Sequence, residues 1–411
     1  MAKTVKTLGF SSSRLKRIDS HMQGYVDKGY LSGLSCLLAR QGDIVHQGFY
    51  GYQDLDSNRE VQADSLFRIY SMTKPITSVA VLMLYEEGHF LLSDPVADYI
   101  PAFKDLQVLD GMDFYGPKLK KPKNPMNIHH LLTHMSGLSY GWYQDTPVDK
   151  LYPDVPTVMK SPNLQSVMNM LGKIPLCFEP GSAWRYSYAT DVLGHLVEVV
   201  SGMSLADFFK SRIFEPLAMV DTGFYVPEDK LERLTHVYCP VEQMSFGVDY
   251  SQVSKGGQLH VIDSPRGPFK HPPAAPSGGG GLVSTLGDYW RFAEMLRQKG
   301  ALSASKERLL GRKTVELMAQ NHVPLSIMPL DIGGVTLLGH GFGLGVSVLI
   351  NMAEALTLGS VGSFGWSGAA MTNFWIDPSE DLVGIFMTQF MPSDFYQIQK
   401  EFRVLSYQAM V

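Results

Sequence analysis

The fold is decided by the stretch Phe67-Arg68-Ile69-Tyr70-Ser71-Met72-Thr73-Lys74-Pro75, which opens an apolar run from Ile76 to Tyr85. This run has apolar residues on all sides and Gly88 follows it as a C-cap, so it predicts a helix of about four turns inside the protein. A spacing of three residues places Ser71 and Lys74 on the same face of the helix start. We therefore expect these two side chains to interact.

The pair suggests a specific chemistry. A serine hydroxyl is a weak nucleophile until a neighbouring group takes its proton. A lysine amine can take that proton when burial or a nearby positive charge makes its neutral form accessible near pH 7. Pro75 has no N–H to offer the carbonyl of Ser71, which predicts irregular or 3₁₀ geometry around the serine.

The Ser-x-x-Lys spacing occurs three times, at Ser13–Lys16, Ser71–Lys74 and Ser303–Lys306. The first and third copies lie in polar, charge-rich surroundings, which are typical of solvated helix starts with a surface lysine. Only the second copy opens an apolar helix. The surroundings therefore favour Ser71–Lys74 as a reactive pair, with a plain helix cap as the alternative.

Length and composition limit the possible classes. A chain of 411 residues is long for one domain and predicts two lobes, or one domain with a large insertion. The net charge of −5 argues against a nucleic-acid partner, and so does the densest basic run, Lys118 to Lys123, because it lies in a predicted Pro/Gly loop without helical phasing. We find no signal-peptide pattern and no apolar stretch of about 18 residues, so we expect a soluble, cytoplasmic protein without a membrane partner.

The three cysteines, Cys36, Cys177 and Cys239, are widely spaced and show no C-x-x-C pair. This argues against a disulfide framework or a zinc site, and it predicts small buried apolar residues. We expect neither a metal nor a cofactor.

Strand patterns gather at the two ends of the chain and helical patterns lie between them. This arrangement predicts an α+β fold in which one antiparallel sheet is built from both termini, flanked by helices, with a mostly helical region inserted. Residues 1–95 and 330–411 would form the sheet lobe, and residues 96–329 the inserted lobe. The predicted strands are Leu34–Ala39, Ile44–Tyr50, Gly345–Ile350, Ala369–Ile376 and Leu382–Met387; the predicted helices are 11–29, 128–134, 163–171, 190–200, 205–213, 285–296 and 394–410. No convincing strand pattern appears in most of the inserted region.

Three further motifs accompany the serine and lysine. Tyr186 follows a Pro-Gly turn just ahead of a helix, where its hydroxyl could relay protons or simply pack with a satisfied partner. The run Gly278–Gly281 lacks the lysine and the spacing of a P-loop, so we interpret it as a close approach between backbones. Gly365 to Ala369 opens a predicted strand, and its small residues would let a substrate carbonyl approach a backbone N–H.

Together these motifs resemble a known family. Ser71-Met72-Thr73-Lys74, Leu131 to Leu138, Tyr186-Ser187-Tyr188, Gly278 to Thr285 and Trp366-Ser367-Gly368 occur in the order and rough spacing of the serine β-lactamase-like superfamily. From about residue 11 to 405 the chain most resembles family VIII carboxylesterases, which are related to class C β-lactamases, DD-peptidases and the acyltransferase that acylates the lovastatin precursor. The resemblance implies a β-lactamase/transpeptidase-like fold.

The resemblance also implies roles for particular residues. Ser71 would be the catalytic serine, with Lys74 and Tyr186 sharing the proton transfers. The backbone N–H groups of Ser71 and Ala369 would form the oxyanion hole.

Two departures from the family pattern bear on the substrate. Tyr188 stands where a Tyr-x-Asn motif has asparagine, and Trp366-Ser367-Gly368 replaces the usual Lys-Thr-Gly. Without that lysine, the anchor for a β-lactam or peptide carboxylate is missing, which favours neutral esters. We expect the substrate to contact residues near the motifs, which are Tyr140, Trp142, Tyr143, Tyr188, Trp366, Ser367 and Gly368. His340 either lines the same site or is structural.

A second serine motif competes with this interpretation. Gly137-Leu138-Ser139-Tyr140-Gly141 matches the G-x-S-x-G nucleophile elbow of α/β-hydrolases. That elbow requires a strand before the serine and a helix after it. The pattern here predicts a helix before Ser139 and none after it, so we expect Ser139 not to be the nucleophile.

The sequence therefore predicts a serine carboxylesterase that hydrolyses short-chain, small-molecule esters through an acyl-Ser71 intermediate. The alternatives are an acyltransferase to an alcohol or a weak β-lactamase of the same fold, and a non-catalytic penicillin-binding sensor. The sequence does not predict the oligomeric state.

Overall fold

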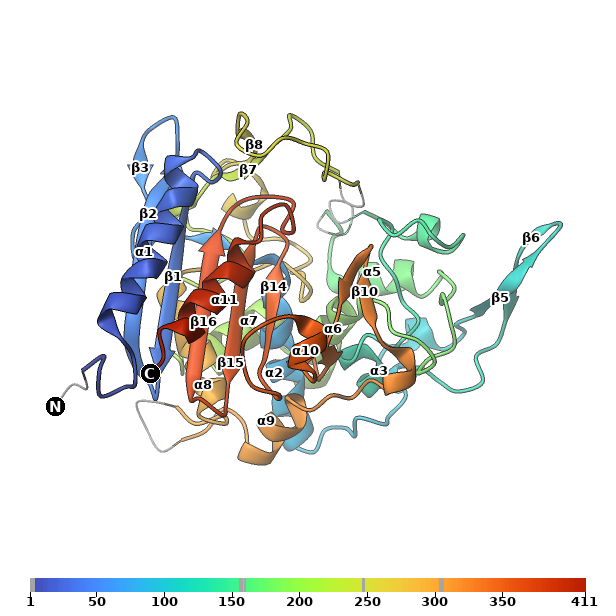
Figure 1. Cartoon of the computed structure of the whole chain (residues 1–411). Coiled ribbons are helices and arrows are strands. Elements are labelled where there is room, and N and C mark those ends of the chain that lie inside the picture. The colour runs from blue at the N-terminus through green and yellow to red at the C-terminus, as the bar shows by residue number, and fades with distance from the viewer. Residues whose placement is uncertain (1–3, 155–157, 159, 246–247, 303–306) are drawn as a thin grey trace.

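Both ends of the chain build one antiparallel sheet, as predicted. In the computed structural model, which describes residues 4–154, 158, 160–245, 248–302 and 307–411, the sheet has eight strands in the order β12-β13-β14-β15-β16-β1-β2-β3 (Figure 1). The strands are β1 (Gly33–Arg40), β2 (Asp43–Asp54), β3 (Arg59–Glu60), β12 (His340–Phe342), β13 (Ser347–Leu349), β14 (Phe364–Gly368), β15 (Thr372–Asp377) and β16 (Leu382–Thr388). The two ends join where β1 pairs with β16, from Leu34 opposite Thr388 to Arg40 opposite Leu382.

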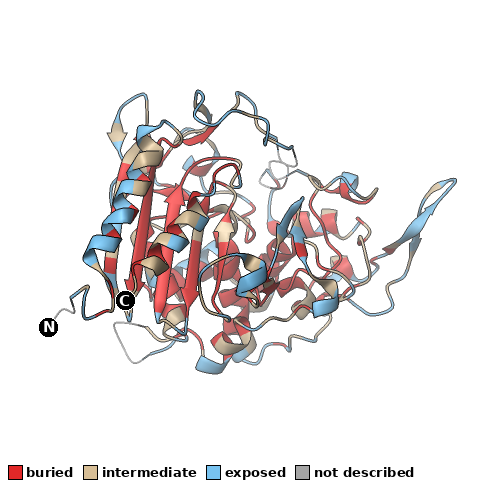
Figure 2. Ribbon diagram, in the orientation of Figure 1, coloured by how far each residue is buried: buried red, intermediate tan, exposed pale blue. Residues whose placement is uncertain are grey.

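The two faces of the sheet pack into different cores, because successive side chains of a strand point to opposite faces. On β1, Cys36 and Leu38 pack with α1 (Ser12–Asp27) and α11 (Ile398–Gln408), which lie together across one face in Figure 1. Leu37 and Ala39 pack into the other core, which also contains α8 (Leu286–Arg297). Figure 2 shows the central strands buried, whereas the outward sides of α1 and α11 are exposed.

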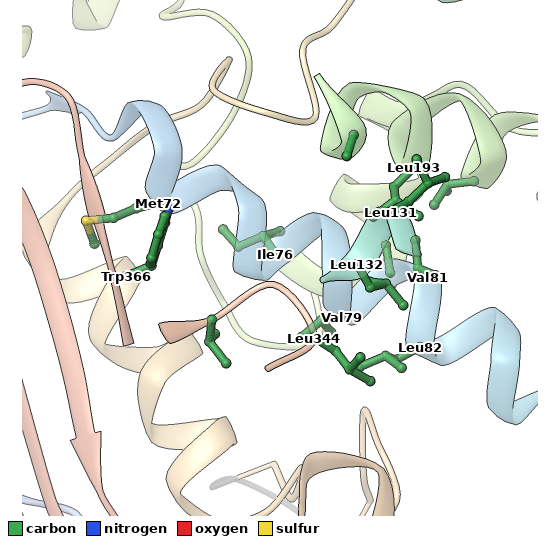
Figure 3. Close-up of a cluster of buried hydrophobic side chains, with 14 of the residues drawn as sticks. Met72, Ile76, Val79, Val81, Leu82, Leu131, Leu132, Leu193, Leu344 and Trp366 are labelled. Carbon is green, nitrogen blue, oxygen red and sulfur yellow. The ribbon is translucent and has the colours of Figure 1, made fainter. Parts of the chain in front are cut away.

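The predicted central helix is α2 (Thr73–Glu86), and every residue from Thr73 to Leu84 is buried. Figure 3 shows its apolar side chains surrounded by residues from several other segments, among them Leu131, Leu193 and Leu344. This helix therefore has no solvated face over most of its length. It forms a rigid base for the two polar residues at its start.

The helices of the inserted region pack around α6 (Ala189–Ser201), which contacts α2, α3 (Ile128–Leu132), α5 (Leu164–Leu171) and α7 (Leu205–Phe209). Helices α3, α5, α6 and α7 were predicted near these positions. A π-helical turn, Lys210–Phe214, extends α7. Two further short helices are α9 (Arg312–Met318) and α10 (Met352–Ala355).

The absence of strands from the inserted region was predicted wrongly. The described residues of this region contain five strands that form no part of the main sheet: β5 (Val108–Asp113) with β6 (Gly116–Lys120), β7 (Val237–Cys239) with β8 (His260–Asp263), and β9 (Val283–Ser284), which pairs with β4 (Phe67–Arg68). These strands are short and lack apolar alternation, so periodicity could not reveal them. Part of the basic run Lys118 to Lys123 belongs to the β5–β6 hairpin, which projects from the body in Figure 1. A further pair, β10 (Leu330–Ile332) with β11 (Val335–Leu337), also lies outside the main sheet.

The strand predicted over Ala369–Ile376 is also corrected. Trp366 to Gly368 end one strand, β14, and residues 369–371 form the turn into the next, β15. Met371 adopts the left-handed conformation there, with φ +63°. A non-glycine residue rarely takes this conformation, so the composition gave no indication of the turn.

Other predictions have mixed outcomes. The three cysteines are free thiols, but Cys177 is only half-buried, contrary to the expectation for all three. Helix α8, inside the predicted insertion, packs on β1, β15 and β16, and the lobe boundaries stay a prediction. In the described ranges no single helix is long and apolar enough to cross a membrane; one pair, Ala189–Ser201 with Leu205–Phe214, reaches that length and composition together but is bent by 83°.

Candidate active site

Ser71 lies on a tight turn that precedes α2. Residues Tyr70–Met72 form a 3₁₀ turn, so the predicted irregular geometry is confirmed. Tyr70 has φ +41°, a strained value for a bulky residue, and such strain needs surrounding contacts that hold it. The hydroxyl of Tyr289 supplies one by donating to the Met72 carbonyl at 2.9 Å. Ser71 itself is half-buried, so it can be reached from solvent.

The amine of Lys74 is buried beside this serine. Lys74 is 1% exposed, and its Nζ lies 3.4 Å from Ser71 Oγ. The amine also donates to the Gly279 carbonyl at 2.7 Å and to Tyr140 Oη at 3.3 Å. Burial of an amine opposes its charged form. The structure therefore brings together the two groups that the sequence singled out, in a dry environment.

Tyr186 presents its ring to the amine. Lys74 Nζ lies 4.4 Å from the centroid of the Tyr186 ring, which is a cation–π distance. The Tyr186 hydroxyl accepts a hydrogen bond from Trp366 Nε1 at 3.3 Å. The motifs that contain Ser71 and Lys74, Tyr186 and Trp366 thus meet at one place.

Tyr140 makes a contact that sequence reasoning missed. We expected it only as an aromatic residue near the substrate, but its hydroxyl is bonded to Lys74. Burial, together with the nearby charge of Asp191, raises the pKa of the Tyr140 phenol well above its ordinary value. The one sequence signal for this contact was the position of Tyr140, two residues after the family motif Leu131 to Leu138.

The glycine run approaches other backbone closely, as predicted. A Cβ atom on Gly278 would lie 2.8 Å from the Thr190 carbonyl oxygen, and one on Gly279 would lie 2.5 Å from Asp191 Oδ2. Larger residues would push this loop away from α6, and the Gly279 carbonyl would then leave Lys74. Asp191 is a second residue that sequence reasoning missed.

The Trp366-Ser367-Gly368 motif lies against the Ser71 turn. A Cβ atom on Gly368 would lie 2.4 Å from the Ile69 carbonyl oxygen, and Thr372 Oγ1 donates to the same oxygen at 3.4 Å. This close approach brings the turn that begins at Ala369 next to the Ser71 turn. The oxyanion hole formed by the N–H groups of Ser71 and Ala369 remains a prediction.

The other expected substrate residues divide into two groups. Trp142 stacks between Tyr140, at 5.6 Å, and Tyr143, at 4.2 Å between ring centroids, and so continues the aromatic wall. Tyr188 packs its ring on Tyr140, but its hydroxyl donates to the Pro153 carbonyl at 2.9 Å.

Two expected residues are occupied elsewhere. Ser367 Oγ accepts a hydrogen bond from Asn373 Nδ2 at 2.9 Å, across β14 and β15. His340 is not among the groups that contact Lys74: its Nδ1 lies 2.9 Å from the Leu338 carbonyl, and the positive charges that act on it belong to Arg403 and Lys400. Burial first, and these charges second, lower the pKa of His340.

Ser139 lies in a different environment. It is fully buried, α3 precedes it, and no helix follows it directly. Its hydroxyl donates to Asp149 and accepts a hydrogen bond from Arg185 Nε at 2.7 Å. The strand–serine–helix context of a nucleophile elbow is absent from this described segment.

The remaining Ser-x-x-Lys pairs carry no comparable geometry. Ser13 and Lys16 are exposed in the first turns of α1, and Ser303–Lys306 lies outside the described residues. Across the part of the chain that the structure describes, no group of three or more His, Cys, Asp or Glu side chains is arranged to hold a metal ion.

Comparisons with known proteins identify the family. A model of the Beta-lactamase family matches residues 18–409, nearly the whole chain. The chain belongs to the Beta-lactamase family. Protein Rv1367c of Mycobacterium tuberculosis (strain ATCC 25618 / H37Rv) is 34% identical over 372 residues, which are 89% of this chain and 88% of that protein. Esterase EstB of Burkholderia gladioli is 30% identical over 388 residues, or 92% of this chain and 91% of EstB.

A solved structure of the same fold supports the family assignment. EstCE1, described as a hydrolase with promiscuous acyltransferase activity, has a TM-score of 0.80 and 28% sequence identity, and the match covers 96% of this chain and 99% of EstCE1. The predicted β-lactamase/transpeptidase-like fold and the resemblance to the Beta-lactamase family are therefore confirmed.

Proposed function

We propose that this Beta-lactamase family protein is a serine carboxylesterase that hydrolyses short-chain esters. The observation that carries the proposal is the 3.4 Å separation between Ser71 Oγ and the buried Lys74 Nζ. An amine at this distance is within reach of the hydroxyl proton. The two relatives named as an esterase and a hydrolase support the same reaction class.

The proposed reaction has two halves. Ser71 Oγ attacks the ester carbonyl carbon while its proton passes to the Lys74 amine, and the resulting oxyanion accepts hydrogen bonds from the N–H groups of Ser71 and Ala369. The bond to the alkoxide then breaks, the alkoxide takes the proton from Lys74, and the alcohol leaves. Water attacks the acyl-Ser71 with the same base, and the acid is released as Ser71 regains its proton.

Two tyrosine hydroxyls are candidates for a share in these proton transfers. Tyr186 holds the place implied by the family resemblance and places its ring over the amine. Tyr140 has no role in the family pattern, but its hydroxyl accepts a hydrogen bond from Lys74 Nζ. We assign the relay to Tyr186 and propose that Tyr140 orients the amine, because a lysine side chain with several hydrogen-bond partners is fixed in one rotamer.

The third motif supports neutral substrates. Trp366 stands where the family pattern has a lysine, and its Nε1 is directed at the Tyr186 hydroxyl. A neutral indole offers no charge to a substrate carboxylate. Tyr140, Trp142 and Tyr143 add an aromatic wall that suits a small apolar acyl or alcohol group.

Acyl transfer to an alcohol is the second candidate. It is supported by EstCE1, whose promiscuous acyltransferase activity occurs in the same fold. Transfer requires only that an alcohol replaces water in the second half of the reaction. The ratio of new ester to free acid, measured as alcohol is added, separates the two reactions.

A series of p-nitrophenyl esters of increasing acyl length, assayed beside a chromogenic cephalosporin, tests the proposal. We expect the fastest turnover with short acyl chains, slow turnover of the cephalosporin, and neither reaction in Ser71→Ala. Faster turnover of the cephalosporin would assign a β-lactamase instead. Stoichiometric labelling without turnover would assign a penicillin-binding sensor.

A further inference from the structure

A buried carboxylate lies behind the Lys74 amine. Asp191, in the first turn of α6, is 2% exposed. Its Oδ1 accepts hydrogen bonds from Ser277 Oγ at 2.6 Å and from the Gly279 N–H at 3.2 Å. The carbonyl of the same Gly279 accepts the hydrogen bond from Lys74 Nζ at 2.7 Å. One residue, Gly279, thus contacts the carboxylate through its N–H and the amine through its carbonyl.

This connection has an electrostatic consequence. Burial raises the pKa of Asp191, and the charge of Lys74 is the largest effect that opposes this rise. The two groups therefore act on each other although they share no direct hydrogen bond.

The family resemblance and the motif spacing gave Asp191 no role, and a helix-start carboxylate has an ordinary structural explanation. The hydrogen bonds of the Asp191 carboxylate indicate a link to the site in addition to this structural role. Besides the backbone N–H of Asp191 itself, the donors are Ser277 Oγ and the Gly279 N–H, which both belong to the glycine loop. The carboxylate is directed at the loop that holds the amine.

We propose that Asp191 is a positioning residue for Lys74: its carboxylate holds Gly279, whose carbonyl binds the amine, and its negative charge stabilises the ammonium that forms during the reaction. The inference rests on the proposed function. A base that must take a proton from Ser71 and later return it works best when neither protonation state is strongly disfavoured. The nearby carboxylate stabilises the ammonium that forms when Ser71 gives up its proton, and the hold on Gly279 keeps the amine beside Ser71.

Other titratable groups also face this pair. Tyr140 and Tyr186 contact the amine. Burial, and then the charge of Lys74, lower the pKa of His134, whereas burial, and then the charge of Asp191, raise the pKa of Tyr188. Among these groups Asp191 is the one carboxylate. Removing its charge should therefore change the pH profile in a way that a purely structural loss would not.

The variant Asp191→Asn tests this directly, because it keeps the shape and an acceptor for the Gly279 N–H. We expect it to lower kcat/KM and to move the acidic limb of the kcat/KM profile for a p-nitrophenyl ester to lower pH by about one unit. The sign follows from charge: without the carboxylate, the amine loses its proton more easily, so the active form appears at lower pH. The rate at which an organophosphonate labels Ser71 should show the same shift.

Asp288→Asn is the matched control. Asp288 is also 2% exposed, burial likewise raises the pKa of its carboxyl, and it accepts hydrogen bonds from Asp221 N–H and Thr222 Oγ1. This variant should lose stability and keep the acidic limb of wild type. If Asp191→Asn does not fold, Ser277→Ala replaces it and should give a smaller shift in the same direction, because it weakens the hold on the carboxylate.

The outcomes distinguish a failure of the role of Asp191 from a failure of the esterase proposal. An unchanged acidic limb in folded Asp191→Asn, or in folded Ser277→Ala, overturns the role of Asp191 and leaves the esterase proposal intact. If wild type neither hydrolyses esters nor reacts at Ser71 with the phosphonate, the proposed function fails and the inference fails with it. A shift in Asp191→Asn that is absent from Asp288→Asn supports both.

Discussion

Two serines of this chain match hydrolase motifs, and their surroundings differ in the property that decides reactivity. Ser71 is half-buried, and a buried amine lies within reach of its hydroxyl. Ser139 is fully buried, and its hydroxyl is held between Asp149 and Arg185. A nucleophile must be reachable and must have a base for its proton. Ser71 meets both conditions. Ser139 is not reachable, and the acceptor of its proton, Asp149, is a weak base because its pKa is lowered to about 2.

The comparison also shows what a buried serine contributes when it is not a nucleophile. Arg185 lies next to Tyr186 in the sequence, and Ser139 lies next to Tyr140. The hydrogen bonds among Ser139, Asp149 and Arg185 therefore tie together the two segments that carry the tyrosines facing Lys74. Ser139 therefore helps to hold the two tyrosines beside Lys74.

The largest expected effect separates the two serines by turnover. Ser71→Ala should lower kcat by on the order of 10⁶-fold, since loss of a nucleophile removes the covalent route. Ser139→Ala should keep kcat within about tenfold of wild type, because it acts only through support of the tyrosines. Steady-state hydrolysis of a p-nitrophenyl ester measures both. Similar losses in the two variants would contradict the assignment.

The two tyrosines sharpen the comparison further. Tyr186→Phe should lower kcat by about 10²- to 10⁴-fold, the usual range for a group that transfers protons. Tyr140→Phe should cost less, since the amine keeps Gly279 as a hydrogen-bond partner. Tyr143→Phe is the control, because the buried Tyr143 hydroxyl has no hydrogen-bond partner among the described residues. If Tyr140→Phe is the more damaging variant, the relay belongs to Tyr140.

Ser139→Ala should be visible in stability instead of activity. The substitution leaves the buried Asp149 without one donor, which costs about 1–3 kcal/mol of the free energy of unfolding. Burial by itself raises the pKa of Asp149, but interactions with Asp145, Ser139 and Thr146 outweigh it and lower the pKa to about 2.

This depressed pKa gives the stability difference a pH dependence. The contribution of Asp149 is present above the unfolded pKa of about 3.9 and is lost as the pH falls towards the folded value. The gap in unfolding free energy between wild type and Ser139→Ala should therefore narrow in that acidic range. A gap that does not change with pH would mean that the hydroxyl does not stabilise the ionised carboxylate.

The smallest expected effect concerns His134, which lies beside the reactive pair. Burial, and then the charge of Lys74, lower the pKa of His134 well below its ordinary value. The unfolded chain binds a proton at this histidine below about pH 6.5 and the folded chain does not, so stability should decline as the pH falls through that value. In His134→Asn, which tolerates the φ of +56° found here, this decline should be shallower in denaturant titrations. An equally steep decline would show that other groups account for it.

The sequence predicted the parts of this molecule that depend on strong local patterns. The all-apolar helix after Ser71, the proline at its start and the strands at both termini determine α2, the 3₁₀ turn and the main sheet. The sequence did not predict β5 to β9 or the turn at Met371, because short strands and left-handed residues depend on tertiary contacts rather than on periodicity. The spacing paired Ser71 with Lys74, and the family resemblance added Tyr186 to the same site. Neither predicted the hydroxyl of Tyr140 or the carboxylate of Asp191 near the amine, because these contacts depend on tertiary structure.

The central claim is that the buried amine of Lys74 makes Ser71 reactive. Its most direct test is the rate of organophosphonate labelling, with the modified residue mapped by mass spectrometry, in wild type and in a folded Lys74→Met variant. We predict one phosphonate per chain on Ser71 in wild type, and labelling at least about 100-fold slower in Lys74→Met. Labelling on Ser139, or an unchanged rate at Ser71 in Lys74→Met, would contradict the claim.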